Sequence, residues 1–325
     1  MNQTDEISSI AAEFLNSTSQ HVFLTGKAGT GKTTFLKSLR EKTHKRFIVV
    51  APTGIAALNA GGVTIHSQFL LPLGSYLPDE SVQADWGPFF NNSILARKNP
   101  LNSERKKVLR EIDLLVIDEV SMLRADILDA LDYRLKAARG EYRRPFGGVQ
   151  LLLIGDLFQL PPIVKDREWS VLHRFYSSIH FFESIALKQS NFVYLELDKV
   201  FRQEEEGFIQ ILNRLRTNRI TSEDIDELNK HYDKKPPENA ITLCTHNKQA
   251  DEINAKQLET LSGKTYSYAS KIDGDFPENL YPLSEELELK VGARVMFIKN
   301  DTVDNLFYNG KLATVTQLRS DSIQV

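Results

Sequence analysis

The sequence contains a single cysteine, Cys244, among its 325 residues. One cysteine excludes an internal disulfide framework and is typical of proteins in a reducing cytosol. Because it lies inside the apolar stretch ITLCT, we expect Cys244 to be a small buried side chain and not a reactive thiol.

Long apolar runs are also lacking. No stretch approaches the roughly 20 apolar residues that cross a bilayer. The N-terminal residues MNQTDEISSI carry acids where a secretory signal carries Lys or Arg. The sequence therefore predicts no membrane partner and a cytoplasmic location.

Neither sign of charge dominates. The formal net charge is −3 and the sequence pI is about 6.2. If nucleic acid is the partner, the attraction must come from a local groove and not from the average charge. The charge total neither supports nor excludes such a partner.

Short apolar runs alternate with amphipathic stretches over the first half of the chain. Continuous runs rich in Val, Ile and Leu are typical of strands buried on both faces of a parallel sheet. The expected strands are residues 21–24, 47–50, 114–117 and 149–154, and the expected helices are 33–42, 54–59 and 125–138. This alternation predicts a doubly wound α/β domain.

Two changes in composition and pattern along the chain predict additional structural units. Residues 68–102 are rich in Pro, Gly, Asn and aromatics, which predicts a small insertion in the first domain. Near Asn191 the α/β pattern restarts, with NFVYLEL and ITLCT as strands and helices expected at 207–216, 223–231 and 247–261. From Asp273 short alternating runs flank Asn309-Gly310, which predicts a small β unit with a tight turn.

The stretch TGKAGTGKTTF, between an expected strand and an expected helix, satisfies the pattern G-x-x-x-x-G-K-[ST]. Its glycines let backbone N–H groups converge on phosphate oxygens, and the following helix adds its positive N-terminus. Lys32 would reach the β and γ phosphates, and the Thr33 hydroxyl would bind Mg²⁺. The alternative is a Gly-rich turn without function. The expected nucleotide-binding residues are Gly26, Ala28, Gly29, Thr30, Gly31, Lys32, Thr33 and Thr34.

The segment EIDLLVIDEVSML places two acids after a buried strand. Asp118 is placed to hold Mg²⁺ through water, and Glu119 to polarise the attacking water. The alternative is an acid pair that caps the next helix. In the next strand, VQLLLIGDLFQLPPI, Gln159 is a candidate sensor of the γ phosphate, or else a turn residue before Pro161-Pro162.

After the second strand comes APTGIAALNAGGVTIHSQF, which is rich in small residues. Helix N-terminal N–H groups here would hold a backbone phosphate, and His66 and Phe69 would stack on bases. Close packing of a helix on the sheet explains the small residues equally well.

The motifs GKAGTGKT, APTGIAALNAGGVTIHS, VIDEVSML, GDLFQLPPI and LDKVFRQ occur in this order. Together they resemble the PIF (petite integration frequency) family of superfamily 1B DNA helicases, relatives of RecD, and bacterial members in particular. The resemblance spans about Val22 to Leu318. It implies tandem RecA-like domains with parallel sheets: a first domain at 1–67 and 103–188, a wedge at 68–102, part of a second domain at 189–272, and the start of an SH3-like insert at 273–325.

The resemblance also implies residue roles. Arg202, in VFRQ, matches the family arginine that reaches the γ phosphate from the second domain. The alternative for Arg202 is a salt bridge to the acids that follow it. The residues matching DNA-gripping motifs are Pro52, Thr53 and His66 on the first domain, and Thr245, His246 and Asn247 on the second. In the wedge, Trp86, Phe89 and Phe90 are expected either to separate strands or to form a small core.

The implied activity is that of an ATP- and Mg²⁺-dependent helicase. Such an enzyme would move 5′ to 3′ on single-stranded DNA and unwind tailed or forked duplexes, as a monomer in the bacterial cytosol or nucleoid. The late family motifs, which include an H-K-S-Q-G type segment, are absent, so we expect a C-terminally truncated piece of a longer protein. The alternatives are a nucleotide-gated DNA-binding ATPase without unwinding and a P-loop ATPase that does not act on DNA.

Overall fold

A computed structural model describes residues 3–80, 88–198, 206–232, 234, 240–272, 283–299, 301, 306–308 and 310–325. The chain divides into two compact units, Met1–Ile225 and Asp226–Val325. Within these described ranges, no helix combines the length and the apolar character needed to cross a bilayer.

The centre of the first unit is a six-stranded parallel sheet in the order β3-β2-β6-β7-β1-β8. Every residue of β1, β6 and β7 is buried. Continuous apolar strands therefore lie in the middle of the sheet, which confirms the predicted α/β class. The strands are β1 (His21–Gly26), β2 (Phe47–Ala51), β3 (Val63–Thr64), β6 (Leu114–Ile117), β7 (Gln150–Gly155) and β8 (Phe192–Leu197).

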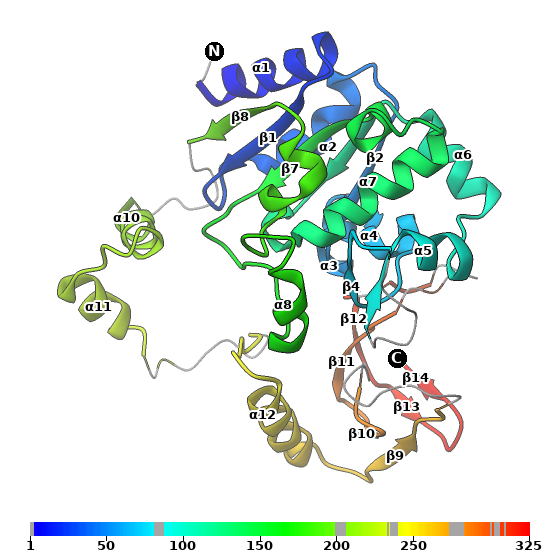
Figure 1. The fold of residues 1–325 in the computed structure, drawn as a ribbon. Helices are drawn as coiled ribbons and strands as arrows, with labels where there is room; N and C mark the ends of the chain where they lie inside the picture. Colours follow the sequence, from blue (N-terminus) through cyan, green and yellow to red (C-terminus); the bar gives the residue numbers. More distant parts are fainter. Residues whose placement is uncertain are drawn as a thin grey trace. The chain divides into compact units, whose positions relative to one another are not determined.

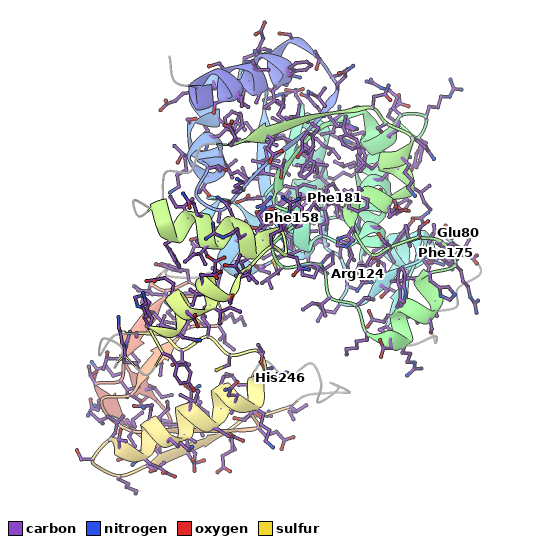
Figure 2. The ribbon with its side chains drawn as sticks, turned by 90° about the vertical axis from the view of Figure 1, so that its left-hand side faces the viewer. Glu80, Arg124, Phe158, Phe175, Phe181 and His246 are labelled. Atoms are coloured by element: carbon purple, nitrogen blue, oxygen red, sulfur yellow. The ribbon has the colours of Figure 1, made fainter. Side chains whose placement is uncertain are left out.

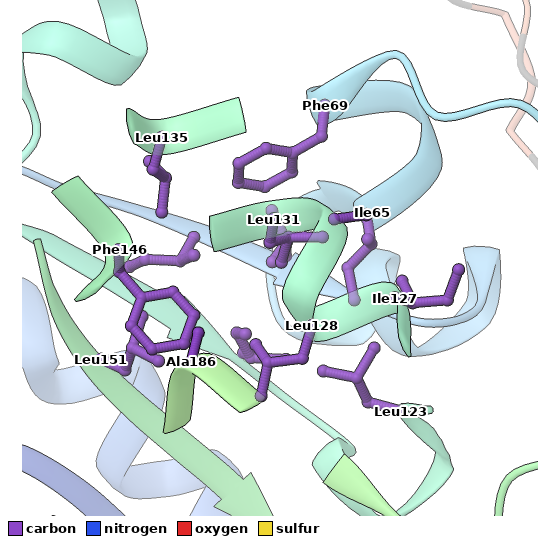
Figure 3. Close-up of a cluster of buried hydrophobic side chains, with 14 of the residues drawn as sticks. Ile65, Phe69, Leu123, Ile127, Leu128, Leu131, Leu135, Phe146, Leu151 and Ala186 are labelled. Atoms are coloured by element: carbon purple, nitrogen blue, oxygen red, sulfur yellow. The ribbon is translucent and has the colours of Figure 1, made fainter. Parts of the chain in front are cut away.

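Helices cover both faces of this sheet, because alternate residues of a strand point to opposite sides. Leu152 and Ile154 of β7 pack against α1 and α2 on one face. On the other face, Leu151 and Leu153 pack against α7. Figure 1 shows α1 and α7 on opposite sides of the strands, and Figure 3 shows the cluster around α7.

The expected crossover helices are confirmed as α2 (Lys32–Lys42), α3 (Gly54–Asn59) and α7 (Ala125–Arg139). The remaining elements of this unit are α1 (Gln3–Ser17), α4 (Ile65–Phe69), β4 (Ser75–Tyr76), β5 (Phe89–Phe90), α5 (Asn92–Lys98), α6 (Ser103–Glu111), the 3₁₀ helices η1 (Val120–Met122), η2 (Pro145–Gly148) and η3 (Phe181–Glu183), α8 (Asp166–Leu172), α9 (Ile185–Lys188) and α10 (Glu206–Arg216).

Within the segment 68–102, β4 and β5 pair in parallel. Phe89 packs against Leu172, and Phe90 belongs to the cluster around α7; they are 8% and 2% exposed. These two phenylalanines therefore form core, which decides between the two expected roles in favour of packing. Trp86 lies outside the described residues.

The strand predicted from NFVYLEL forms, but its predicted place was wrong. As β8 it runs parallel to β1, with His21 opposite Phe192 and Gly26 opposite Leu197. It is an edge strand of the first sheet, so Phe192 and Tyr194 keep 43% and 55% of their surfaces exposed. Periodicity identifies a strand, but it does not say which distant strand will be its neighbour.

The stretch ITLCT was predicted as a strand and is not one. Ile241 and Leu243 are 69% and 93% exposed, and Cys244 is half-buried, so the expectation of a buried cysteine was also wrong. A strand forms only where neighbouring backbone takes its N–H and C=O groups. In the part of the chain that the structure describes, no strand lies against these residues.

The second unit holds a helix and three antiparallel strand pairs around a small core of Leu289, Ala293, Val315 and Leu318. β11 and β12 pair antiparallel, so strands flank Asn309-Gly310 as expected. The expected tight turn includes Asn309, which lies outside the described residues. The elements of the second unit are α12 (Asn247–Thr260), β9 (Tyr266–Ala269), β10 (Glu286–Leu289), β11 (Arg294–Met296), β12 (Leu312–Thr314), β13 (Gln317–Leu318) and β14 (Ile323–Gln324). Helix α11 (Ser222–Asn229) spans the boundary between the two units.

Candidate nucleotide and DNA site

The glycine-rich loop links the carboxyl end of β1 to the N-terminus of α2, as predicted. Gly31 precedes α2 in the left-handed region, with φ of 92°. A Cβ atom at Gly26 would lie 2.4 Å from the Leu197 carbonyl oxygen of β8 and 2.6 Å from Thr30 Oγ1. The loop therefore needs glycine at these positions, because a larger residue would push it away from β8.

The Lys32 ammonium lies within this loop. Its Nζ atom donates to the Gly26 carbonyl at 2.5 Å and to the Lys27 carbonyl at 2.9 Å. Burial lowers the pKa of Lys32, while the charges of Asp156 and Glu119 act in the opposite direction. The loop thus carries a partly buried cation, which suits a triphosphate, and lies beside acids from other strands, which suit the Mg²⁺ that accompanies it.

The acid pair follows β6 at the same edge of the sheet. Asp118 donates its N–H to the Val50 carbonyl at 2.9 Å, and its Oδ1 accepts the N–H of Glu119 at 3.0 Å. Asp118 is 7% exposed, and burial raises its pKa to about 6. Glu119 has φ of 50°, a left-handed conformation that is uncommon outside glycine and that recurs at functional sites.

The donors at this edge fit Mg²⁺. In phosphate sites this ion takes one or two protein oxygens and completes its shell with phosphate and water. Burial disfavours the Asp118 anion, and a bound cation would reverse that effect. Thr33, the second residue of α2, is exposed and offers the second oxygen. Among the described residues no group of three or more His, Cys, Asp or Glu has metal-binding geometry, so the ion would depend on substrate oxygens.

The residues that directly follow β7, here called the β7 tip (156–159), add a further set of polar groups. Asp156, which follows β7, is 1% exposed. Its Oδ2 accepts a hydrogen bond from Gln159 Nε2 at 3.0 Å and forms an ion pair with Arg216 Nη1 of α10. The charges of both Asp156 and Arg216 act on Lys32. The predicted Gln159 is thus tied to a carboxylate at the phosphate loop.

Neither Asp156 nor Arg216 was predicted from the sequence to have a role in the site. Asp156 had the same signal as Asp118, an acid directly after a continuous apolar strand. Arg216 had none, because it lies 60 residues away from its partner in the chain. Arg202 lies outside the described residues and stays a prediction.

The DNA-gripping candidates of the first unit follow β2 and β3. Thr53 caps α3, its hydroxyl accepting the Ala56 N–H at 3.3 Å. His66 lies on α4 and is half-buried, and burial lowers its pKa, with Arg124 adding to the effect. Phe69, expected to stack on a base, is 0% exposed in the core around α7, so that expectation was wrong. Since Ile65 and Phe69 are four residues apart on α4, both face the core.

Two further residues of this segment, Pro52 and Gly62, bear on the choice between DNA contact and packing. Pro52 is partly exposed directly before Thr53. A Cβ atom at Gly62 would lie 2.2 Å from the Val49 carbonyl oxygen. Close packing therefore explains Gly62, and the partly exposed residues Pro52, Thr53 and His66 stay candidates for DNA contact.

Thr245, His246 and Asn247 lie in the second unit, at the start of α12. All three are exposed, and Thr245 Oγ1 lies 2.9 Å from His246 Nδ1. Figure 2 shows His246 at this helix start. Exposed polar side chains and free helix N–H groups are suited to contact a phosphate backbone.

Comparison with known proteins gives a consistent result. The PIF1-like helicase family matches residues 1–226. The human ATP-dependent DNA helicase PIF1 is 33% identical over 315 residues, covering 93% of this chain and 45% of that protein. The chain therefore spans less than half the length of this relative.

Solved structures agree. A structure of two coordinating Pif1 helicases at forked double-stranded DNA matches with a TM-score of 0.86 and 41% identity, covering 99% of this chain and 73% of that one. The Bacteroides Pif1 helicase in complex with ADP-AlF3 and single-stranded DNA matches with a TM-score of 0.83 and 40% identity, covering 99% and 72%. The chain has the phosphate loop and the acid pair described above, and it matches these proteins over most of its length. It therefore belongs to the PIF1-like helicase family.

Proposed function

We propose that the full-length protein containing this chain is an ATP-dependent DNA helicase that moves 5′ to 3′ on single-stranded DNA and unwinds duplexes. The observation that supports this most is that Lys32 interacts electrostatically with Asp156, Glu119 and Asp118 at one edge of the sheet. In a PIF1-like helicase, such an edge is suited to bind and hydrolyse a nucleoside triphosphate.

The loop residues would hold the nucleotide. Backbone N–H groups between Gly26 and Thr34 bind phosphate oxygens, and Lys32 neutralises the β and γ phosphates. Thr33 and Asp118 hold Mg²⁺, which when bound neutralises charge that develops on the phosphates.

Three further residues would act on the reaction. Glu119 accepts a proton from the attacking water and orients it. Gln159 positions that water against the γ phosphate, and Arg202 stabilises the charge of the transition state from the second domain. These roles explain why the acid pair and the β7 tip follow neighbouring strands.

DNA would be held by both units. Pro52, Thr53 and His66 contact the strand on the first unit; Thr245, His246 and Asn247 contact it on the second. Nucleotide state must change the affinity of each unit for DNA, because only a difference in affinity between states produces directed steps. Because β8 belongs to the first sheet, we place the RecA-like first domain at 1–67 and 103–197, the wedge at 68–102, part of the second domain after β8 up to 272, and an SH3-like insert from 273.

The proposed partners are single-stranded DNA and tailed or forked duplexes. The structures of relatives with single-stranded and forked DNA support these partners. We further propose that the protein acts as a monomer in the bacterial cytosol or nucleoid, in repair, recombination or replication-linked processes.

The test is ATP hydrolysis by the full-length protein with and without oligo-dT, followed by unwinding of 5′-tailed and 3′-tailed duplexes. We expect DNA to stimulate hydrolysis and only the 5′-tailed duplex to be unwound, with both activities lost in Lys32→Ala. Stimulation without unwinding would replace the proposal with a nucleotide-gated DNA-binding ATPase. Hydrolysis indifferent to DNA would replace it with a P-loop ATPase that acts elsewhere.

A further inference from the structure

Arg216, the last residue of α10, forms an ion pair with Asp156 at the β7 tip. The two side chains are 17% and 1% exposed. A carboxylate buried to this extent needs its cation, because removing one partner leaves an uncompensated charge. The contact therefore fixes how α10 meets the edge of the sheet within the first unit.

The Asp156 carboxylate has other partners. Its Oδ2 accepts both the Arg216 guanidinium and the Gln159 side-chain amide, the latter at 3.0 Å. Its Oδ1 accepts the backbone N–H of Phe158 at 3.1 Å. One carboxylate thus orients the loop that carries Gln159.

The guanidinium of Arg216 has a second contact on the same loop. Its carbon lies 4.5 Å from the centroid of the Phe158 ring. Phe158, labelled in Figure 2, is 66% exposed, so the guanidinium covers only part of the ring. A planar guanidinium makes an ion pair and a ring contact together, which a lysine ammonium does less well.

We propose that Arg216 is a positioning residue for ATP hydrolysis, which acts through Asp156 to hold the Gln159 amide at the phosphate loop. This rests on the proposed function, since it takes Gln159 to position the attacking water. It adds a role for α10: any movement of that helix is transmitted to the γ-phosphate side of the loop through a single carboxylate.

The test uses the full-length protein and compares Arg216→Ala with Arg214→Ala. Arg214 lies on the same helix and forms an ion pair with Asp224, away from the loop, so it is a matched control. We expect Arg216→Ala to lower kcat for ATP by about 10- to 100-fold, the size of effect that a misplaced reacting group produces. The KM for ATP should change much less, and Arg214→Ala should keep the kcat of the unmodified protein.

Two further variants separate positioning from simple stability. Arg216→Lys keeps the charge and should recover part of kcat, while the double variant Arg216→Ala/Asp156→Asn should lose no more kcat than Arg216→Ala alone, because both residues act through one contact. Melting temperatures are measured alongside.

The proposal is overturned if Arg216→Ala has the kcat of Arg214→Ala. It is also overturned if kcat falls only at temperatures where the variant has begun to unfold. This outcome can be told apart from a failure of the proposed function. If DNA does not stimulate ATP hydrolysis by the unmodified protein, the proposed helicase function is wrong. The effect of Arg216→Ala on kcat without DNA still tests the positioning role.

Discussion

Tyr76 donates its backbone N–H to Oδ2 of the buried Asp126 carboxylate across 2.9 Å. The same oxygen accepts Arg124 Nη2 at 2.7 Å, and Arg124 also donates to Glu168 and Ser75. Asp126 lies in the first turn of α7, the helix that follows the acid pair. A single guanidinium, labelled in Figure 2, therefore ties the segment 68–102 to the chain that carries the proposed catalytic acid.

We expect Arg124→Ala to lower the free energy of unfolding by about 3–5 kcal/mol, because it leaves two buried carboxylates without their cation. The measurement is urea unfolding at neutral pH. The control is Arg46→Ala, which breaks an ion pair with Asp113 whose side chains are 64% and 42% exposed. That loss should be much smaller, because solvent screens an exposed ion pair. Equal losses in the two variants would show that the Arg124 network contributes no more than a surface pair.

Glu119→Gln tests the proposed base. The amide has the shape of the carboxylate but cannot accept the proton, so we expect kcat for ATP to fall by about 10²- to 10⁴-fold. Binding of a fluorescent ATP analogue should be retained, since the phosphate loop is untouched. The matched control is Glu104→Gln on the exposed surface of α6, which should hydrolyse ATP normally. Normal hydrolysis by Glu119→Gln would remove this residue from the mechanism.

The parts that could be predicted from the sequence are those whose physical cause is local. The strand–loop–helix around Lys32 is determined by adjacent residues, and the strand before Asp118 by four consecutive apolar ones. What escaped prediction depends on partners far along the chain. β8 has a strand pattern, but its place beside β1 is a long-range pairing. ITLCT has the composition of a strand, but it has no strand neighbour among the described residues.

Within the candidate site the same division holds. The positions of Lys32, Thr33 and Asp118 follow from motif spacing. Arg216 reaches the loop through its ion pair with Asp156, and nothing in the sequence around Arg216 encodes that long-range contact. Phe69 shows the converse: an aromatic residue beside a candidate DNA contact was expected to stack on a base, and helical geometry places it in the core.

A comparison of two glycines tests whether packing explains the small residues after β2. Gly62→Ala would bring a Cβ atom to 2.2 Å from the Val49 carbonyl oxygen. We expect this backbone clash to lower the free energy of unfolding by about 1–3 kcal/mol. Gly207→Ala on α10, where a Cβ atom meets nothing within 4 Å, should be neutral or raise stability by under about 1 kcal/mol. Full stability of Gly62→Ala in urea unfolding would show that close packing does not explain the glycine at this position.

His21, at the start of β1, should make stability depend on pH. Its Nδ1 accepts the Leu151 N–H at 3.0 Å, and its ring meets the edge of Phe146 with centroids 5.4 Å apart. Burial lowers the pKa of His21 from 6.5 to about 4. Between these two values the unfolded chain binds a proton that the folded chain does not, so stability is full above pH 6.5 and falls as the pH drops toward 4.

The expected contribution of His21 over that window is about 3 kcal/mol, from the size of the shift in pKa. The measurement is urea unfolding at a series of pH values for the unmodified protein and for His21→Asn, whose amide oxygen can accept the Leu151 N–H without titrating. We expect the variant to have a shallower fall below pH 6.5. His44→Asn, at an exposed position, should leave the profile unchanged. Parallel profiles for the unmodified protein and His21→Asn would mean that this histidine is protonated equally in the folded and unfolded chain.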